Sequence, residues 1–221
     1  AFDRKTKRDG HMSVELRRSL EWWQKVLQPR LAEARKWEEP DDCPLHLFCD
    51  ASGSPAHLGV VFFGDGHCMW THMSPPPSVL ALFRRRRDQQ IMCLELLAIS
   101  LGLCTFEPQL CGRKVVVHSD NKGSETCVRR GSARSTDHAQ LVYEHWLQAV
   151  CSNMHLFVRR VATGHDIAAL PSRKDFRLLG AMGGSGSPAG IGEQVSRRGR
   201  LVGAAGKVEV VAWWRPVPPW C

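Results

Sequence analysis

Three short, mainly apolar stretches follow one another in the first half of the chain, with polar turn residues between them. The stretches cover residues 45–50, 57–63 and 67–73, and short segments with Gly, Ser, Pro and Asp separate them. Short runs of this kind between turn residues are typical of strands, and such short separations favour hairpin turns. The pattern therefore predicts an antiparallel meander. The proline-rich segment 74–90 predicts a loop, with a short turn at 79–83, because proline cannot sustain a strand ladder.

Longer apolar runs follow this loop. Residues 91–104 are apolar over a length that suits a buried helix, and residues 114–120 form a β-branched run typical of a central strand. Helical patterns cover 121–131 and 135–153, and a fifth strand is predicted over 155–161. The order β-β-β-α-β-α-α-β indicates an α/β fold. We expect a mixed five-stranded sheet, in which parallel strands follow the three antiparallel ones and helices flank the faces.

Composition divides the chain into three parts. Residues 1–43 form an N-terminal arm, in which 12–27 predict an amphipathic, Trp-rich helix whose apolar side should pack against the next domain. Residues 44–179 contain the predicted α/β domain. Residues 180–221 begin as a Gly- and Ser-rich linker and continue as a basic tail. We expect this tail to be flexible, to become ordered against a partner, or to have no role.

The charge balance favours an anionic partner. Thirty Lys and Arg against 22 Asp and Glu give a formal net charge of +8, with a pI near 9.2. Such an excess suits nucleic acid, although a merely soluble basic protein has the same charge.

The nine cysteines form no Cys-x-x-Cys pair, which favours a reduced, intracellular chain in the nucleus or cytoplasm. There is no secretory signal, and no apolar run reaches the roughly 18 residues of a membrane span, so we expect no membrane contact.

Three carboxylates stand in apolar surroundings. Asp50 and Asp120 each end a predicted strand, and Glu95 is the only charge between residues 91 and 104. A buried carboxylate needs a cation, a hydrogen-bond cage or a metal. Two acids at neighbouring strand ends and a third on a helix would form the oxygen-only pocket that Mg²⁺ prefers. Alternatively, Asp50 and Asp120 cap a turn or a helix.

Four segments in order, DASGSPAHLGVVF, ELLAI, VVVHSDN and DIAALPSR, resemble the ribonuclease H domain of retroelement reverse transcriptases. The resemblance implies that Asp50, Glu95 and Asp120 are catalytic metal ligands for two Mg²⁺ or Mn²⁺ ions. It implies hydrolysis of the RNA strand of an RNA/DNA hybrid. It also implies a polymerase domain upstream in a longer polyprotein. An integrase or Holliday-junction nuclease on the same fold fits these motifs less well.

The fourth motif departs from the family pattern. Ala169 stands where the resemblance places a fourth metal-binding Asp, and Asp166 lies three residues earlier. On a helix, Asp166 would lie one turn before that position and would need a shifted backbone to serve as the fourth catalytic carboxylate. The alternative is a catalytically inactive ribonuclease H-like module with a binding or structural role.

Several residues are candidates for contact with nucleic acid. Ser52 in the first hairpin, and Asn121 and Lys122 after Asp120, could approach a phosphate, although an ordinary turn and helix start explain them equally well. Four consecutive arginines in the predicted loop suit backbone phosphates, but they also suit a solvated loop. These four are Arg84, Arg85, Arg86 and Arg87.

Overall fold

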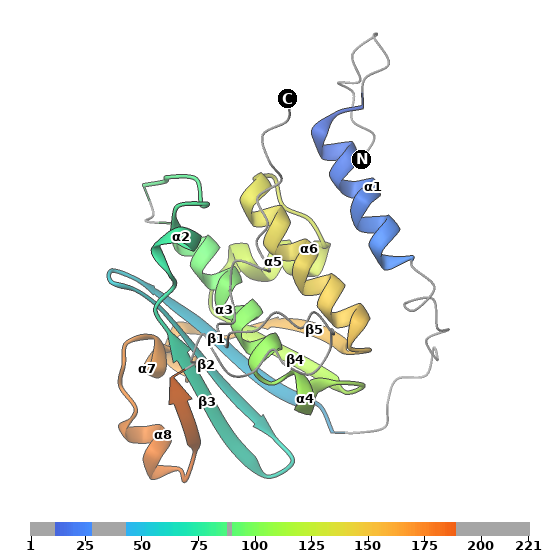
Figure 1. Cartoon of the computed structure of the whole chain (residues 1–221). Coiled ribbons are helices and arrows are strands. Elements are labelled where there is room, and N and C mark those ends of the chain that lie inside the picture. The colour runs from blue at the N-terminus through green and yellow to red at the C-terminus, as the bar shows by residue number, and fades with distance from the viewer. Residues whose placement is uncertain (1–11, 28–42, 88–89, 189–221) are drawn as a thin grey trace, which may run out of the picture.

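Six strands form one mixed sheet in the order β5-β4-β1-β2-β3-β6 (Figure 1). The structure is a computed structural model, and it describes residues 12–27, 43–87 and 90–188. The first three strands make the predicted antiparallel meander, with Asp50 opposite Gly59 and Gly59 opposite His72. They are β1 (Leu45–Gly53), β2 (Ala56–Gly64) and β3 (His67–Met73).

Two parallel strands extend the sheet beyond β1, as predicted. β4 (Lys114–Ser119) pairs in parallel with β1, and β5 (His155–Arg160) pairs in parallel with β4. Parallel neighbours need a crossover, and helices supply it in both cases. The carboxyl ends of β1 and β4 therefore lie side by side, which positions Asp50 and Asp120.

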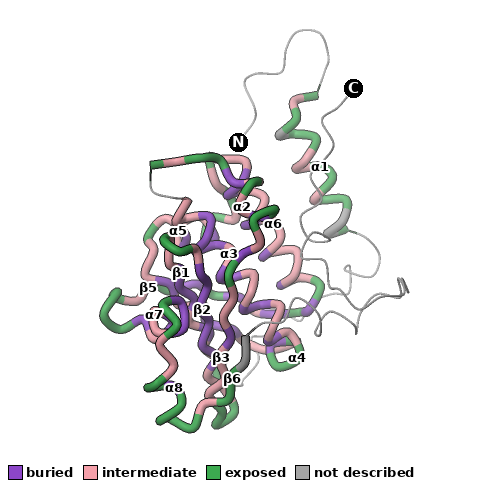
Figure 2. Tube along the Cα trace, turned by 60° about the vertical axis from the view of Figure 1, so that its left-hand side comes forward, coloured by how far each residue is buried: buried purple, intermediate pink, exposed green. Residues whose placement is uncertain are grey.

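One face of the sheet is covered by α3 (Ile91–Thr105), α5 (Lys122–Arg130) and α6 (Thr136–Cys151), with the short α4 (Glu107–Leu110) after α3. Alternate strand residues are buried against this layer and form the main core (Figure 2). Glu95 lies in the first turns of α3 and is buried among apolar residues of that core.

The opposite face carries α7 (Ala169–Ser172), α8 (Arg177–Ala181) and the 3-10 turn η1 (Thr163–His165). Val61, Ala168 and Leu179 form a second small core beneath them. α7 lies directly on β2 because residue 59 is glycine. A Cβ there would overlap the backbone nitrogen of Ser172 and lie 2.6 Å from the carbonyl oxygen of Ala168.

A sixth strand, β6 (Ser185–Pro188), was not predicted. It lies in the Gly- and Ser-rich segment and pairs in parallel with β3. Gly186 lies so close to the indole of Trp70 that any side chain at position 186 would overlap the ring. Tertiary contact therefore makes a strand from a sequence typical of a linker. Residues 189–221 of the predicted tail lie outside the described residues, as do residues 1–11 and 28–42 of the arm.

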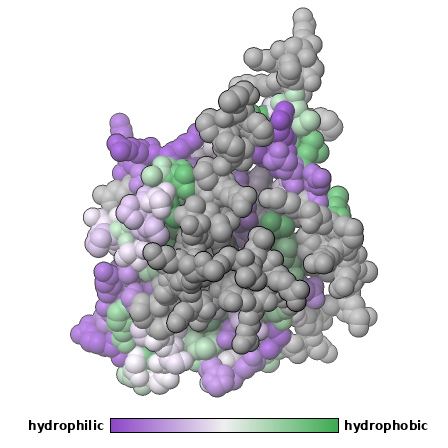
Figure 3. Space-filling view, viewed as in Figure 1, coloured by the Kyte–Doolittle hydropathy of each residue, from purple (hydrophilic) through white to green (hydrophobic). Residues whose placement is uncertain are grey.

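The predicted amphipathic helix is α1 (Val14–Val26), which begins after Ser13 with the Ser13 hydroxyl accepting from the amide of Leu16. Trp22 anchors it on α6, where its indole N–H donates to the carbonyl of Tyr143 at 3.0 Å. Trp22 therefore packs against the domain as expected, whereas five other apolar side chains of this segment are exposed. These side chains, which are 38% to 67% exposed, are Val14, Leu16, Leu20, Trp23 and Leu27. Figure 3 shows apolar surface along α1.

The predicted fold class is confirmed. The sheet has three antiparallel strands followed by parallel strands, with flanking helices, and β6 is an addition to the five predicted strands. A short helix, α2 (Pro77–Leu80), lies where a turn was expected in the proline-rich loop. None of the helices in the described ranges has the length and apolarity needed to cross a bilayer.

Candidate metal centre

The three predicted carboxylates come together at one end of the sheet. Asp50 lies in β1, Asp120 directly follows β4, and Glu95 reaches them from α3. One carboxylate oxygen of each lies within 4.8 Å of the others. The parallel register explains this arrangement, because Phe48 pairs with His118, and Asp50 and Asp120 each lie two residues further along. Both side chains therefore occupy the same row of the sheet.

Asp166 adds a fourth carboxylate to this neighbourhood. It is 5% exposed and its charge interacts with those of Asp50, Glu95 and Asp120. Asp166 is not on a helix, contrary to the one-turn spacing expected from the sequence. It follows η1, and its Oδ1 accepts from the amide of Ala168 at 3.0 Å, which forms a tight turn before α7. Ala169, the first residue of α7, supplies no ligand atom from its side chain.

Burial makes Asp50, Glu95 and Asp166 hard to ionise. Desolvation, with the negative charges of Asp50 and Asp120 added to it, raises the pKa of Glu95 to about 9. Desolvation also raises the pKa of Asp166 to about 7. Burial raises the pKa of Asp50, and the hydrogen bond that Ser172 donates to Asp50 opposes this shift. In the metal-free chain these shifts favour the neutral, protonated forms of Glu95 and Asp166.

Two oxygens of the cluster lack any compensating contact. Within the described residues, Glu95 Oε2 and Asp166 Oδ2 are buried without a hydrogen-bond partner. Unpartnered buried carboxylate oxygens are costly, and either a proton or a cation relieves them. All the donors are carboxylate oxygens, the ligand type that Mg²⁺ and Mn²⁺ prefer. The residues present therefore fit a hard divalent cation.

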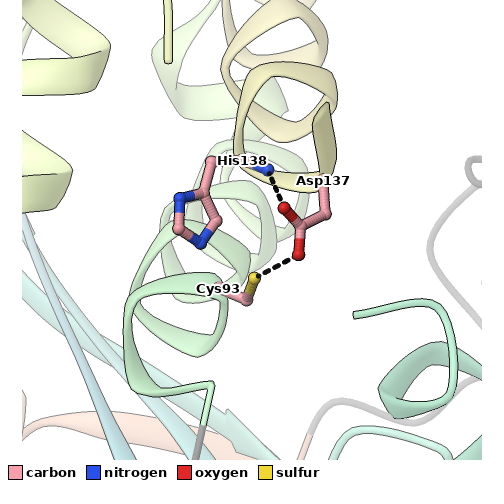
Figure 4. Close-up of side chains that lie close together, drawn as sticks. All are labelled: Cys93, Asp137 and His138. Carbon is pink, nitrogen blue, oxygen red and sulfur yellow. Dashed lines mark hydrogen bonds between the residues drawn. The ribbon is translucent and has the colours of Figure 1, made fainter. Parts of the chain in front are cut away.

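A second group with metal-ligand atoms close together consists of Cys93, Asp137 and His138 (Figure 4). Asp137 accepts from the Cys93 thiol at 3.4 Å and from the amide of His138 at 3.0 Å. Both of its oxygens also accept from the guanidinium of Arg86 at 2.8 Å. Burial raises the pKa of Cys93 to about 12, so its thiol stays protonated. This group is therefore an ion-pair anchor, in which Asp137 holds the loop before α3 through Arg86. The guanidinium of Arg86 already neutralises the carboxylate of Asp137.

The anchor changes the interpretation of the four arginines. Arg86 pairs with Asp137 and donates to Ser135, and its side chain is only 23% exposed. The guanidinium of Arg86 is thus held within the protein, and its contact with nucleic acid stays a prediction. Arg84, Arg85 and Arg87 are exposed.

The other residues predicted to contact nucleic acid differ in their exposure and in their hydrogen bonds. Asn121 caps α5, with its Oδ1 accepting from the amides of Gly123 and Ser124, and Lys122 beside it is exposed. Ser52 is half-buried in β1. Ser172 is a partner of Asp50 that sequence reasoning missed, although it belongs to the DIAALPSR motif.

Two solved structures have a similar fold. One is the RNase H1 of the halophilic archaeon Halobacterium salinarum, which is 12% identical, with a TM-score of 0.43, over 61% of this chain and 98% of that chain. The other is the N-terminal RNase H domain of a Mycobacterium tuberculosis protein, fused to maltose-binding protein. It is 15% identical, with a TM-score of 0.42, over 64% of this chain and 99% of that chain. No protein-family model and no curated protein matches the chain.

Proposed function

We propose that this chain is a metal-dependent nuclease domain of the ribonuclease H type, which hydrolyses the RNA strand of an RNA/DNA hybrid. The observation that carries the proposal is the carboxylate cluster. Asp50, Glu95 and Asp120 have ligand oxygens within 4.8 Å of one another. Two buried oxygens nearby, on Glu95 and Asp166, have no hydrogen-bond partner among the described residues. A buried cluster of this kind is explained by the cation it would hold.

Asp50, Glu95 and Asp120 would hold two Mg²⁺ or Mn²⁺ ions, and Asp166 would replace the carboxylate missing at position 169. When bound, such ions activate water and stabilise the leaving oxygen in phosphodiester hydrolysis. The contribution of the protein is to orient the carboxylates that would bind the ions. Ser172 fixes one oxygen of Asp50, and the tight turn at Ala168 fixes Asp166. Fixed ligands need little rearrangement when the ions bind.

The nucleic acid would bind across this end of the sheet. Lys122 follows Asp120 by two residues, and Arg84, Arg85 and Arg87 supply exposed cations on the loop before α3. Ser52 and Asn121 would give polar contacts to the backbone. Contacts of this kind recognise phosphates and 2′-hydroxyls without reading base sequence. The net charge of +8 supports such a partner.

The motifs support an origin in a retroelement reverse transcriptase, with a polymerase domain upstream and an intracellular site of action in the nucleus or cytoplasm. The sequence DASGSPAHLGVVF followed by ELLAI, VVVHSDN and DIAALPSR carries this part of the proposal.

A second candidate function is a catalytically inactive module that binds nucleic acid or has a structural role. Ala169 favours it, because α7 begins with a side chain that cannot bind a cation. In this case the fold and the basic surface would be kept while the metal centre is incomplete.

Cleavage of a labelled RNA/DNA hybrid with Mg²⁺ or Mn²⁺ separates the two functions. We expect the parent chain to cut the RNA strand, and Asp50→Asn and Asp166→Asn to abolish or strongly reduce cutting. Asp65→Asn is the matched control, because Asp65 is an exposed carboxylate at the β2–β3 turn that pairs with Arg113. Cutting by Ala169→Asp alone would support the inactive module. No cutting and no Mn²⁺ binding by either chain would contradict the nuclease proposal.

A further inference from the structure

On the sheet face that carries α7, the described helices pack over only part of the width of the sheet. α7 packs on β1, β2 and β3, whereas the described helix that packs on β4 and β5 is α5, in the layer of α3 and α6. On β5, Leu156 and Val158 are buried in the main core. His155, Phe157 and Arg159 alternate with them and so point to the other face, where Phe157 and Arg159 are exposed.

The strand register defines this surface, which we call the β4–β5 half-face. Lys114, Val116 and His118 of β4 lie beside His155, Phe157 and Arg159 of β5. Phe48 of β1 pairs with His118 and forms the border of the half-face toward β1. Phe157, 40% exposed, is the one large apolar side chain in the described strands that is exposed.

Aromatic rings lie close together on the half-face. Phe48 and His118 are stacked, with ring centroids 4.3 Å apart and planes at 10°. The ammonium of Lys114 lies 5.6 Å from the centroid of the Phe157 ring. An exposed ring at mid-strand can stack with another planar group, and the ammonium that lies over the Phe157 ring favours an anion nearby.

The charges on the half-face are of one sign. Lys114 and Arg159 are its charged residues, and Asp120, the nearest carboxylate along β4, lies beyond the end of the strand. This combination of rings and cations suits a polyanion with exposed planar groups. It does not suit a stable protein interface, which needs roughly 800 Å² on each partner and a broad apolar centre.

We propose that the β4–β5 half-face binds single-stranded nucleic acid, with one base stacked on Phe157 and a backbone phosphate beside Arg159. A duplex does not satisfy this surface, because its bases are already stacked on one another, whereas an unpaired strand can turn its bases outward. Such binding is insensitive to base sequence and sensitive to salt.

The half-face continues into the carboxylate cluster. His118 precedes Asp120 by two residues on β4, and Phe48 precedes Asp50 by two residues on β1. A strand held on the half-face would therefore run toward the centre where the hybrid is proposed to be cut. Single-strand binding goes beyond that proposed function and does not require cleavage.

The test uses the full chain in EDTA, with fluorescence anisotropy of a labelled 12-nucleotide oligo(dT) or oligo(U) strand at low salt. We expect Phe157→Ala to weaken binding by roughly five- to hundredfold, the range for loss of one stacked base. Phe157→Trp should retain binding. Leu178→Ala is the matched control, because Leu178 is an exposed apolar residue on α8. Arg159→Gln should reduce the salt dependence of binding.

Equal affinity of the parent chain and Phe157→Ala, with unchanged circular dichroism, would overturn the proposal. So would an equal loss in Leu178→Ala, or a parent chain that binds no single strand and instead forms a Phe157-dependent dimer in sedimentation. If Phe157→Ala does not fold, Arg159→Gln decides, and an unchanged salt dependence overturns the proposal. Cleavage of a blunt-ended hybrid by Phe157→Trp and Arg159→Gln is measured separately, so failure of the nuclease proposal is distinguishable.

Discussion

The hydroxyl of Ser172 donates a hydrogen bond to Oδ2 of Asp50, although 122 positions separate the two residues in sequence. Ser172 lies at the end of α7, and Asp166 lies just before that helix. One contact thus joins β1, which carries the first carboxylate, to the segment that carries the fourth. The placement of Asp166 depends on how α7 sits on the sheet.

Replacing Ser172 by Ala should impair metal binding on the acid side. Burial raises the pKa of Asp50 and the Ser172 hydroxyl opposes that shift, so its loss raises the pKa further. We expect Mn²⁺ affinity at pH 6 to fall by about tenfold, the effect of one hydrogen bond to a charged group, and to recover at higher pH. Calorimetric titration at several pH values measures this. Ser172→Thr keeps the hydroxyl and should resemble the parent. An identical pH profile for Ala and the parent would contradict the assignment.

Gly59→Ala should displace α7. The new Cβ would overlap backbone atoms of Ser172 and Ala168, which cannot rotate away as a side chain can. We expect a loss of roughly 1–3 kcal/mol in the free energy of unfolding, together with weaker Mn²⁺ binding. Urea denaturation measures the first effect. Gly164→Ala is the control, because a Cβ at position 164 meets nothing within 4 Å. Equal stability of both variants would show that α7 tolerates the shift.

The metal-free chain should lose stability as the pH rises from about 4.5 to about 9. In the folded chain the pKa of Glu95 is raised to about 9, first by burial, so Glu95 holds a proton that the unfolded chain has released. The folded state binds more protons in this window, and its free energy of unfolding falls with rising pH. The pKa of Asp166, raised to about 7, acts in the same direction over the lower part of the window.

Glu95→Gln should flatten this dependence and stabilise the chain at pH 8 in EDTA, because the amide needs no proton to stay neutral. Urea denaturation at pH 5.5 and pH 8 compares the two chains. Saturating Mg²⁺ should stabilise the parent and leave Glu95→Gln largely unaffected. A variant as pH-dependent as the parent would show that Glu95 is not the group responsible.

The four arginines should separate into two roles. Arg86→Ala removes the partner of Asp137, whose carboxylate is 4% exposed, and we expect a loss of roughly 2–4 kcal/mol in the free energy of unfolding. Arg85→Ala, at an exposed neighbouring position, should leave stability unchanged and weaken hybrid binding. Thermal unfolding and hybrid affinity are measured for both. Equal effects of the two substitutions on both quantities would contradict this division.

Much of the fold was predictable because its signals are local. Short apolar runs between turn residues located β1, β2 and β3, and the β-branched run located β4. Asp50 and Asp120 were predicted to meet because both follow apolar runs, and parallel pairing of β1 and β4 does bring them together.

The remaining features depend on contacts that the sequence pattern does not contain. β6 forms because the indole of Trp70 covers glycines of linker-like composition. Arg86 has the same local sequence as its neighbours, and only the fold shows that it faces Asp137. The spacing from Asp166 to Ala169 was interpreted as one helical turn, whereas α7 begins after Asp166. The apolar side of α1 was expected to be buried because periodicity indicates an apolar face and not what covers it.

β6 also protects the edge of the sheet from pairing with other copies of the chain. It occupies the outer hydrogen-bonding groups of β3, and its last residue, Pro188, has no amide hydrogen to offer a further strand. A chain cut at Leu179, where the composition changes, would lose this cover and present β3, with the ring of Trp70, as a template for edge-to-edge aggregation. The four residues of β6, which have a linker-like sequence, thus cap the edge of the sheet.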